Sequence, residues 1–257
     1  MTKHVRELFD LTGKAAIITG GSRGLGLEMA EALGEAGAKL MICARRDDWL
    51  QSALETLRGR GFEAEGMLCD VVVPEQVQAV TEAAIEKFGR IDVLINNAGI
   101  SWGSMPEDMA LEKWRQVLDV NLTGCFLFAQ SVGREMLKQE SGSIINITSI
   151  SGITSSANGP FYAGYVASKA GLIGLTRELA ASWGRKGIRV NAIAPGFFHS
   201  RLADAVIDIY ETSIQENNPI PRIGREGELK GAVVFLASDA SSYVTGQTIV
   251  VDGGMTI

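Results

Sequence analysis

Short apolar runs alternate along the chain with stretches of helical periodicity. The apolar runs lie at 14–19, 39–43, 63–69, 91–95, 143–148, 188–193 and 248–251. Helical spacing of apolar residues fills 25–36, 47–58, 74–88, 111–137 (with a possible kink near Gly124) and about 160–184. Strands that alternate with helices of about 10–15 residues indicate parallel βαβ units. The pattern predicts an α/β fold with a doubly wound sheet of seven parallel strands, flanked by at least six helices.

The length and composition suit one large domain. The 257 residues are 46% hydrophobic and 21% charged, and no Pro/Ser-rich linker interrupts them. We therefore expect residues 1–257 to form a single dinucleotide-binding and catalytic domain. The segment 197–225 differs from the rest, because it is polar, contains Pro219-Ile220-Pro221 and has no strand pattern. A mobile substrate lid over a cleft is the prediction there.

Charge and cysteine content narrow the function classes. A net charge of −6 argues against a nucleic-acid partner. Cys43, Cys69 and Cys125 are odd in number and widely spaced, and no Cys/His cluster suggests a metal site. The charged N-terminus lacks the apolar core of a signal peptide, and no apolar run approaches the ~18 residues of a membrane span. We expect a soluble cytoplasmic protein without a membrane or a metal.

A glycine-rich loop follows the first predicted strand. The sequence T-G-G-S-R-G-L-G at 19–26 has glycines at 20, 24 and 26, between a strand and a helix. Such glycines permit a tight turn and let backbone N–H groups approach a pyrophosphate. The loop is therefore a predicted dinucleotide site, with a plain glycine-rich turn as the alternative. Its predicted cofactor-binding residues are Gly20, Ser22, Arg23, Gly24, Leu25 and Gly26.

The end of the second predicted strand distinguishes two forms of the cofactor. An NAD site usually has an acidic residue there, which accepts from the ribose 2′-OH. Here Ala44 takes that position and Arg45 and Arg46 follow, while Arg23 lies in the glycine loop. Guanidinium groups bind phosphate bidentately, so the pattern favours NADP(H) over NAD. Alternatively, the arginines pair with Asp47 and Asp48 on a solvated face.

Tyr165 and Lys169 are the candidate acid–base pair. Residues four apart on a helix lie on one face. A phenol has an ordinary pKa of about 10, and a nearby ammonium lowers it. Tyr162 competes for this role, but Val166 stands four residues after it. Taken alone, the pair also fits a packed ring beside a solvated amine.

These motifs together carry a family resemblance. With the glycine loop, N-N-A-G at 96–99 and Y-x-x-x-K at 165–169, the chain resembles the short-chain dehydrogenase/reductase family from Phe9 to the closing V-D-G-G at 251–254. The T-G-x-x-x-G-x-G spacing is similar to the short oxidoreductase branch. Overall the chain looks most like gluconate 5-dehydrogenases, which act on sugar acids, with 3-oxoacyl-carrier-protein reductases close behind. The resemblance implies a Rossmann fold and NADP(H)-dependent interconversion of a secondary alcohol and a ketone.

The resemblance also implies catalytic roles. Tyr165 would donate the proton in carbonyl reduction, and Lys169 would bind the nicotinamide ribose and lower the pKa of Tyr165. Ser149 would polarise the substrate oxygen, with Ser151 as the alternative. Asn121 would hold a water that links Lys169 to solvent, or would simply bridge backbone groups in its helix.

Further cofactor contacts follow from the same resemblance. Asp70 would meet the adenine amino group, unless it only caps the turn before Pro74, and Asn97 to Gly99 would line the adenosine. Pro195 and Gly196 would seat the nicotinamide and phosphates, with Ser200 in place of the usual threonine. The implied residues beyond the glycine loop and the arginines are Asp70, Val71, Asn97, Ala98, Gly99, Tyr165, Lys169, Pro195, Gly196, Phe198 and Ser200.

The substrate pocket is less well defined by sequence. Tyr165 follows Ser149 by sixteen residues, a longer spacing than is common in the family. The extra residues fall in 153–162 and form either a pocket wall or a surface loop. Weaker candidates for substrate contact are Trp102, Ser151, Phe197, His199 and Arg201. His199 and Arg201 could bind a carboxylate or a polyol, although each alone is also typical of a surface group.

The resemblance extends to assembly. The family commonly forms homotetramers through the two long helices near 111–137 and 160–184 and the C-terminal strand, so a tetramer is expected, with a dimer as the alternative. A non-catalytic nucleotide sensor of the same fold is the second class of function. Such chains typically lose the catalytic Tyr, Lys or Ser, and this chain retains all three.

Overall fold

Seven parallel strands form one sheet in the computed structural model, which describes residues 4–155, 161–199 and 204–257. Their order is β3-β2-β1-β4-β5-β6-β7, so the chain winds outward from β1 in two directions. This confirms the predicted α/β architecture. The strands are β1 (Ala15–Thr19), β2 (Lys39–Ala44), β3 (Ala64–Leu68), β4 (Val93–Asn96), β5 (Gly142–Ile147), β6 (Ile188–Pro195) and β7 (Thr248–Val251).

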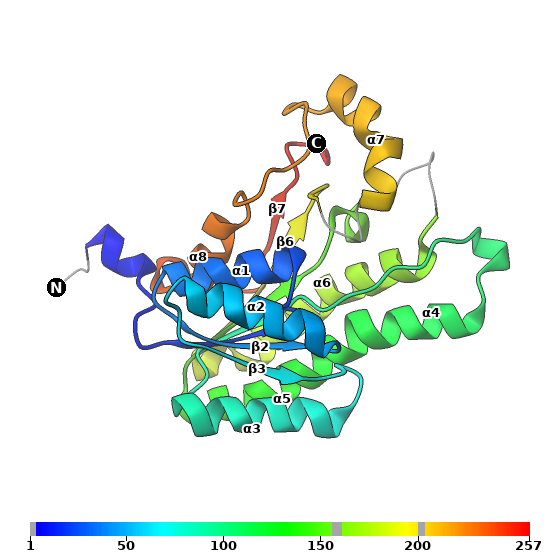
Figure 1. Cartoon of the computed structure of the whole chain (residues 1–257). Helices are drawn as coiled ribbons and strands as arrows, with labels where there is room; N and C mark the ends of the chain where they lie inside the picture. Colours follow the sequence, from blue (N-terminus) through cyan, green and yellow to red (C-terminus); the bar gives the residue numbers. More distant parts are fainter. Residues whose placement is uncertain (1–3, 156–160, 200–203) are drawn as a thin grey trace.

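Helices cover both faces of the sheet (Figure 1). Pro74 begins α3 and Gly89 ends it with a φ of 78°, a conformation that favours glycine. The helices are α1 (Gly24–Glu35), α2 (Asp47–Gly59), α3 (Pro74–Phe88), α4 (Leu111–Leu118), α5 (Gly124–Gln139), α6 (Ala163–Trp183), α7 (Asp204–Asn217) and α8 (Lys230–Ala237).

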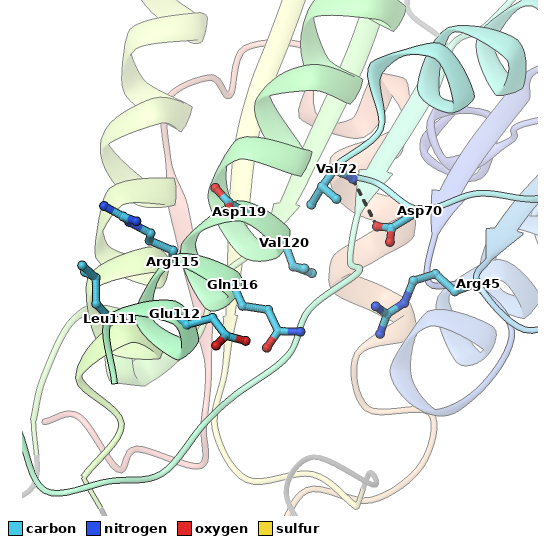
Figure 2. Close-up of a pocket in the computed structure, with 9 residues that line it drawn as sticks. All are labelled: Arg45, Asp70, Val72, Leu111, Glu112, Arg115, Gln116, Asp119 and Val120. Atoms are coloured by element: carbon cyan, nitrogen blue, oxygen red, sulfur yellow. Dashed lines mark hydrogen bonds between the residues drawn. The ribbon is translucent and has the colours of Figure 1, made fainter. Parts of the chain in front are cut away.

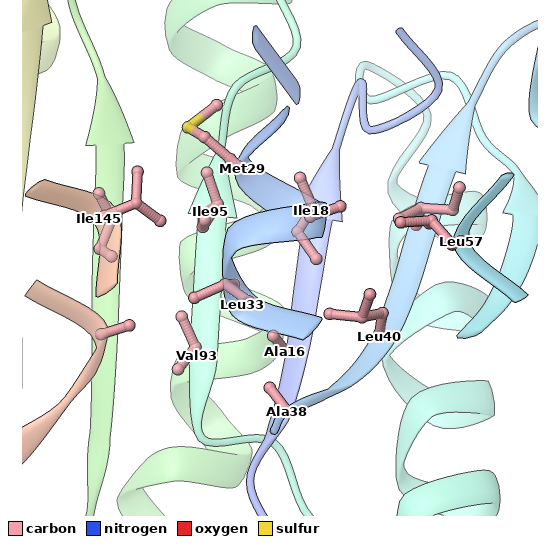
Figure 3. Packing of buried hydrophobic residues seen from close by; sticks show 14 of the residues in the cluster. Ala16, Ile18, Met29, Leu33, Ala38, Leu40, Leu57, Val93, Ile95 and Ile145 are labelled. Carbon is pink, nitrogen blue, oxygen red and sulfur yellow. The ribbon is translucent and has the colours of Figure 1, made fainter. Parts of the chain in front are cut away.

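Burial on both faces explains why the strands read as continuous apolar runs. Ala16 and Ile18 of β1 belong to a core cluster shared with α1, α2 and α8, part of which Figure 3 shows. Ile17 points the other way, into a second cluster shared with α3, α5 and α6. Successive side chains of a strand alternate between faces, and in a covered parallel sheet both faces are apolar.

The long helical pattern at 111–137 is interrupted. A π-helical turn, η3 (Asp119–Thr123), separates α4 from α5 and ends next to Gly124, where the sequence suggested a kink. A Cβ atom on Gly124 would approach Val71 Cγ2 to 2.7 Å, so glycine allows this turn to pack against the loop after β3. Asn121 lies within the π-helical turn.

Two helices were not predicted. α7 lies within the segment 197–225, for which the sequence predicted only a polar lid, and Figure 1 shows it beyond the carboxyl ends of β6 and β7. α8 is apolar over most of K-G-A-V-V-F-L-A, so no amphipathic period marks it. A short apolar run cannot be divided between strand and buried helix by periodicity alone.

Among the described helices, none combines the length and the apolar character needed to cross a membrane. The longest, α6, has 21 residues and carries Lys169, Arg177 and Glu178.

Leucines of two neighbouring strands allow a test of the core. Leu40 of β2 is fully buried in the first cluster, whereas Leu68 at the end of β3 is 48% exposed. We expect Leu40→Ala to lower the free energy of unfolding by about 2–5 kcal/mol, because it removes buried methyl groups and leaves a cavity. Leu68→Ala should cost less than about 1 kcal/mol. Urea unfolding at one fixed protein concentration measures both, and equal losses would contradict this account of the core.

Candidate cofactor and catalytic site

The predicted site residues gather at one edge of the sheet. The glycine loop follows β1, Arg45 follows β2, Asp70 follows β3, Asn97 follows β4 and Ser149 follows β5. Because all seven strands are parallel, their carboxyl ends share this edge. The strand order reverses between β1 and β4, and ligands of open α/β sheets bind at such a switch point.

The glycine loop is held by a close approach to the end of β4. Gly20 has a φ of +63°, and a Cβ atom on Gly26 would overlap the Gly20 carbonyl oxygen. Asn97 Nδ2 donates to the carbonyl oxygens of Thr19 at 3.0 Å and Gly20 at 3.2 Å. The close contact leaves no room for a side chain at Gly26.

Thr19 completes this contact from the strand side. Its Oγ1 atom accepts hydrogen bonds from the backbone N–H groups of Asn97, at 2.9 Å, and Ala98, at 3.0 Å. Thr19 is not among the residues that the sequence predicts for the site. A hydroxyl at the end of an otherwise apolar strand, just before the loop, was the available signal.

The N-terminus of α1 opens toward the same edge. Among the residues that the structure describes, no side chain caps this helix at Arg23. The first-turn N–H groups of a helix have no partner inside it and carry part of its positive dipole. The turn that begins at Gly24 therefore presents backbone donors to an anion.

The three arginines differ in their surroundings. The guanidinium carbons of Arg23 and Arg46 lie 3.6 and 4.1 Å from the centroid of the Trp49 ring. Arg46 also donates to Asp48 through Nε, at 3.0 Å, and Nη2, at 2.6 Å. The alternative interpretation, pairing on an exposed face, is therefore right for Arg46 and Asp48 in this structure.

Arg45 instead lines an open hollow of about 490 Å³. Figure 2 shows Arg45 and Asp70 on one side of it and residues of α4 on the other. Asp70 Oδ1 accepts from the Val72 backbone N–H at 3.3 Å, so Asp70 does stabilise the turn before Pro74 while it also borders the hollow. The lining residues are Arg45, Asp70, Val72, Leu111, Glu112, Arg115, Gln116, Asp119 and Val120.

Tyr165 and Lys169 of α6 lie beside Ser149 at the end of β5. The side chains of Tyr165 and Ser149 are hydrogen-bonded. Lys169 Nζ lies 5.5 Å from the centroid of the Tyr165 ring and donates to the Ile147 carbonyl at 2.8 Å. Ser151 contributes its backbone N–H, which donates to Ser149 Oγ at 3.1 Å. Of the two candidate serines, Ser149 is thus the one whose side chain contacts the tyrosine.

Burial sets the protonation of this pair. It raises the pKa of the Tyr165 phenol, and the hydrogen bond with Ser149 lowers that pKa in part. Burial also lowers the pKa of the Lys169 ammonium. Lys169 is not among the causes of the shift in the Tyr165 pKa here, so the prediction that Lys169 depresses that pKa beside an oxidised cofactor stays a prediction.

Asn121 is fully buried and joins two elements. Its Oδ1 accepts from the Ile100 N–H at 2.8 Å, while Nδ2 donates to the Ile100 carbonyl at 2.9 Å and to Ser168 Oγ at 3.0 Å. Ser168 Oγ donates in turn to the Tyr165 carbonyl at 2.7 Å. Asn121 therefore fixes the loop after β4 to the helix that carries Tyr165, rather than bridging backbone groups of its own helix.

The end of β6 approaches the C-terminal segment. A Cβ atom on Gly196 would come within 2.8 Å of the Asp252 Cα, so glycine is needed where these loops meet. Phe198 is only 5% exposed, and its ring packs in the core against Gly224. The predicted contacts Ser200 and Arg201 lie outside the described residues.

The substrate candidates surround the start of α6. Trp102 is exposed, with Lys113 Nζ 4.7 Å from its ring centroid. A Cβ atom on Gly103 would approach the Tyr162 ring to 3.0 Å, so this loop lies against the residue before α6. Phe197 is half-buried and His199 exposed. The part of 153–162 between 156 and 160 lies outside the described residues.

Comparisons with known proteins show which family the chain belongs to. The model of a family described as "Enoyl-(Acyl carrier protein) reductase" matches residues 20–256. A 3-oxoacyl-acyl-carrier-protein reductase of Staphylococcus epidermidis is 40% identical over 243 residues, 94% of this chain and 98% of its own. The chain belongs to the short-chain dehydrogenase/reductase family.

Solved structures of the family share the whole fold. A short-chain type dehydrogenase/reductase from Mycobacterium marinum superposes with a TM-score of 0.94 at 39% identity, covering 98% of this chain and 99% of its own. A gluconate 5-dehydrogenase from Burkholderia cenocepacia, in complex with NADP and tartrate, gives a TM-score of 0.93 at 38% identity with the same coverage. The family assignment therefore makes this chain an oxidoreductase.

The hydrogen bond between Ser149 and Tyr165 predicts a shift in titration. Since that bond lowers the pKa of Tyr165, Ser149→Ala should raise it, and the phenolate should form at higher pH than in the unmodified protein. A pH titration of phenolate absorbance, with Tyr165→Phe as the reference to subtract, measures this shift. Ser151→Ala is the matched control and should leave the titration unchanged, because only the backbone of Ser151 contacts Ser149. A shift in Ser151→Ala alone would instead assign the contact to that residue.

Proposed function

We propose that this chain is an NADP(H)-dependent oxidoreductase that interconverts a secondary alcohol and a ketone, with Tyr165 as acid and base. The observation that carries the proposal is the hydrogen-bonded pair of Tyr165 and Ser149 beside the buried Lys169. This group stands at the same sheet edge as the glycine loop. A hydride carrier, an oxygen-polarising donor and a titratable acid are the parts that such a reaction needs.

The cofactor loop fits a dinucleotide. Any side chain at Gly26 would fill the space where the turn closes, and the open N-terminus of α1 offers donors to a pyrophosphate. Arg23, Arg45 and Arg46 would hold a 2′-phosphate, and Asp70 would meet the adenine. The gluconate 5-dehydrogenase structure named above contains NADP, which supports the same choice here. The remaining proposed contacts are those that the sequence predicted: Gly20, Ser22, Gly24, Leu25, Val71, Asn97, Ala98, Gly99, Pro195, Gly196, Phe198 and Ser200.

The chain's own groups would manage the proton. A bound nicotinamide supplies or accepts the hydride. In reduction, Tyr165 gives its phenolic proton to the substrate oxygen, and its raised pKa keeps that proton in place at neutral pH until the oxygen develops charge. Ser149 donates to the same oxygen and positions it.

Lys169 and Asn121 would return the proton to Tyr165. Because burial lowers the pKa of Lys169, its ammonium holds a proton less tightly than a solvated lysine does. We propose that Asn121 holds a water between Lys169 and solvent. Asn121 suits this role because it joins the loop after β4 to Ser168 of α6, the residue next to Lys169. Lys169 would also bind the nicotinamide ribose.

A sugar acid is the substrate class that we propose. The gluconate 5-dehydrogenase in the comparison was solved with tartrate, a hydroxy acid, and His199 with Arg201 supplies the candidates for a carboxylate or polyol. The 40% identity to a 3-oxoacyl-acyl-carrier-protein reductase favours a second candidate, a 3-oxoacyl thioester. The segment 197–225, with α7 beyond the carboxyl ends of β6 and β7, would close over either substrate as a lid.

We propose a homotetramer that works in the cytoplasm. Gly164 and Gly171 of α6 pack within the chain, but a Cβ atom on Gly174 would meet no described atom within 4 Å, and Ala170 is exposed. Small exposed residues on a long helix allow a second helix to approach closely. All three cysteines are buried free thiols, which suits a reducing compartment.

A substrate panel tests the proposed reaction. Sugar acids, polyols and short 3-oxoacyl thioesters are screened by cofactor absorbance, with NADP and NAD forms in parallel. We expect turnover with a sugar acid and with NADP(H) preferred. Turnover only with the thioesters would select the second candidate. Binding of NADPH without oxidation or reduction of any carbonyl or alcohol in the panel would instead indicate a nucleotide sensor.

Replacement of the acid tests the mechanism. Tyr165→Phe should lower kcat by roughly 10²–10⁴-fold, the usual contribution of a positioned acid, with NADPH affinity nearly unchanged. Tyr162→Phe is the matched control, since Val166 rather than a lysine follows Tyr162 by four residues and its ring lies against Gly103, and it should retain turnover. Full turnover in Tyr165→Phe would refute the role of Tyr165.

Light scattering tests the assembly. The unmodified protein should have about four times the 27.5 kDa mass of one chain. Gly174→Arg should reduce that mass, because a long side chain would separate the packed helices. Gly59→Arg, an equally open position on α2, should leave the tetramer intact. A monomeric unmodified protein would contradict the proposed assembly.

A further inference from the structure

A stack of two arginines and a tryptophan lies beside the cofactor loop. Arg23 comes from that loop, Arg46 directly precedes α2, and Trp49 is in the first turn of α2. Both guanidinium groups lie over the Trp49 ring, at 3.6 and 4.1 Å from its centroid. Stacking on an indole orders a guanidinium that would otherwise be mobile on an exposed surface.

Arg46 already holds an anion from its own chain. Asp48 binds its Nε and Nη2 atoms with two parallel hydrogen bonds, of 3.0 and 2.6 Å. Two parallel N–H donors of a guanidinium are also what a phosphate group uses. Arg46 holds the pKa of Asp48 below its ordinary value, so the carboxylate is charged at neutral pH. Arg45, by contrast, has no hydrogen bond or ion pair with any residue that the structure describes, and it faces the hollow.

We propose that Asp48 is an internal competitor of the cofactor 2′-phosphate, and that Trp49 is a positioning residue that keeps Arg23 and Arg46 at the phosphate site. The inference rests on the proposed function, because it requires that these arginines bind NADP(H). Binding of the phosphate to Arg46 must displace the Asp48 carboxylate, and that carboxylate also repels the incoming dianion. NAD(H), which has no 2′-phosphate, can bind without displacing Asp48.

The consequence is a reduced preference for NADP(H). Three arginines, with alanine rather than an acidic residue at position 44, would suggest strong discrimination against NAD(H). One of the three, Arg46, is however already bound to Asp48. The ion pair is exposed, so it remains exchangeable. Arg45 is available to the 2′-phosphate from the start. Arg46 can bind the phosphate only after the phosphate has replaced the Asp48 carboxylate.

Asp48→Asn with Asp47→Asn as the matched control tests the competition. Both variants lose one negative charge, but Asp47 accepts from Gln51 at 3.0 Å rather than from an arginine. Affinities for NADPH and NADH are measured separately by calorimetry on the full chain. We expect Asp48→Asn to tighten NADPH about twofold to fivefold, the range of an exposed ion pair, and to leave NADH unchanged. Asp47→Asn should change neither by as much.

Two results would overturn the competition. Equal tightening of NADPH by both variants would show a general effect of net charge. Weaker NADPH binding in Asp48→Asn would show that Asp48 supports the site. If the unmodified protein binds NADPH and Asp48→Asn leaves its affinity unchanged, the inference fails while the proposed function stands. If the unmodified protein binds neither cofactor, the proposed function itself fails.

Trp49→Leu and Trp49→Phe test the positioning role. Trp49→Leu should weaken NADPH several-fold more than NADH, because Arg23 and Arg46 lose the ring that orders them. Trp49→Phe should recover part of that loss, since a smaller ring can still stack. Thermal unfolding of each variant separates folding from binding. If Trp49→Leu weakens the binding of NADPH and NADH equally, Trp49 contributes only to packing and does not position the two arginines.

Discussion

The contact between the glycine loop and the end of β4 is the constraint on which the site depends. Because Gly26 has no side chain, the loop after β1 can approach the end of β4, and hydrogen bonds from Asn97 hold the two together. The strand order reverses at this point. The next loops along the edge then take their places at the spacing of adjacent parallel strands. Without this contact, the arginines after β2 and the serine after β5 would still follow their strands, but no common surface for one ligand would join them.

The second determinant is the loss of water around Tyr165 and Lys169. Burial acts in opposite directions on the two pKa values, raising that of an acid that is neutral when protonated and lowering that of a cation. Both shifts favour uncharged groups. The phenol of Tyr165 therefore retains its proton, and the ammonium of Lys169 releases one more readily than a solvated lysine does. Such a pair suits the transfer of a proton to a carbonyl oxygen. The hydrogen bond with Ser149 partly offsets the rise in the pKa of Tyr165.

The sheet, and the gathering of most candidate residues at one of its edges, could be predicted from the sequence because both depend on local signals. Apolar runs mark strands that are covered on both faces, and strand ends mark the edge where Tyr165, Ser149 and the glycines meet. The prediction missed α7, although the buried Ile207 and Ile214 stand seven residues apart on one face of that helix. It also missed α8, which is apolar almost throughout and has no helical period. It could not foresee that burial dominates the pKa of Tyr165, nor the stack on Trp49, because desolvation and stacking depend on tertiary neighbours that no spacing records.

The π-helical turn at Asp119–Thr123 has a structural consequence for the hollow beside Arg45. A single wide turn within a helix accommodates one residue more than regular α-helical winding would. One residue corresponds to about 100° of rotation, so this turn gives α4 an angular offset relative to α5. The offset decides which α4 side chains, among them Glu112 and Gln116, face the hollow. Loss of one residue there would rotate α4 as a unit and present a different set of charges beside Arg45, while every strand stayed in register.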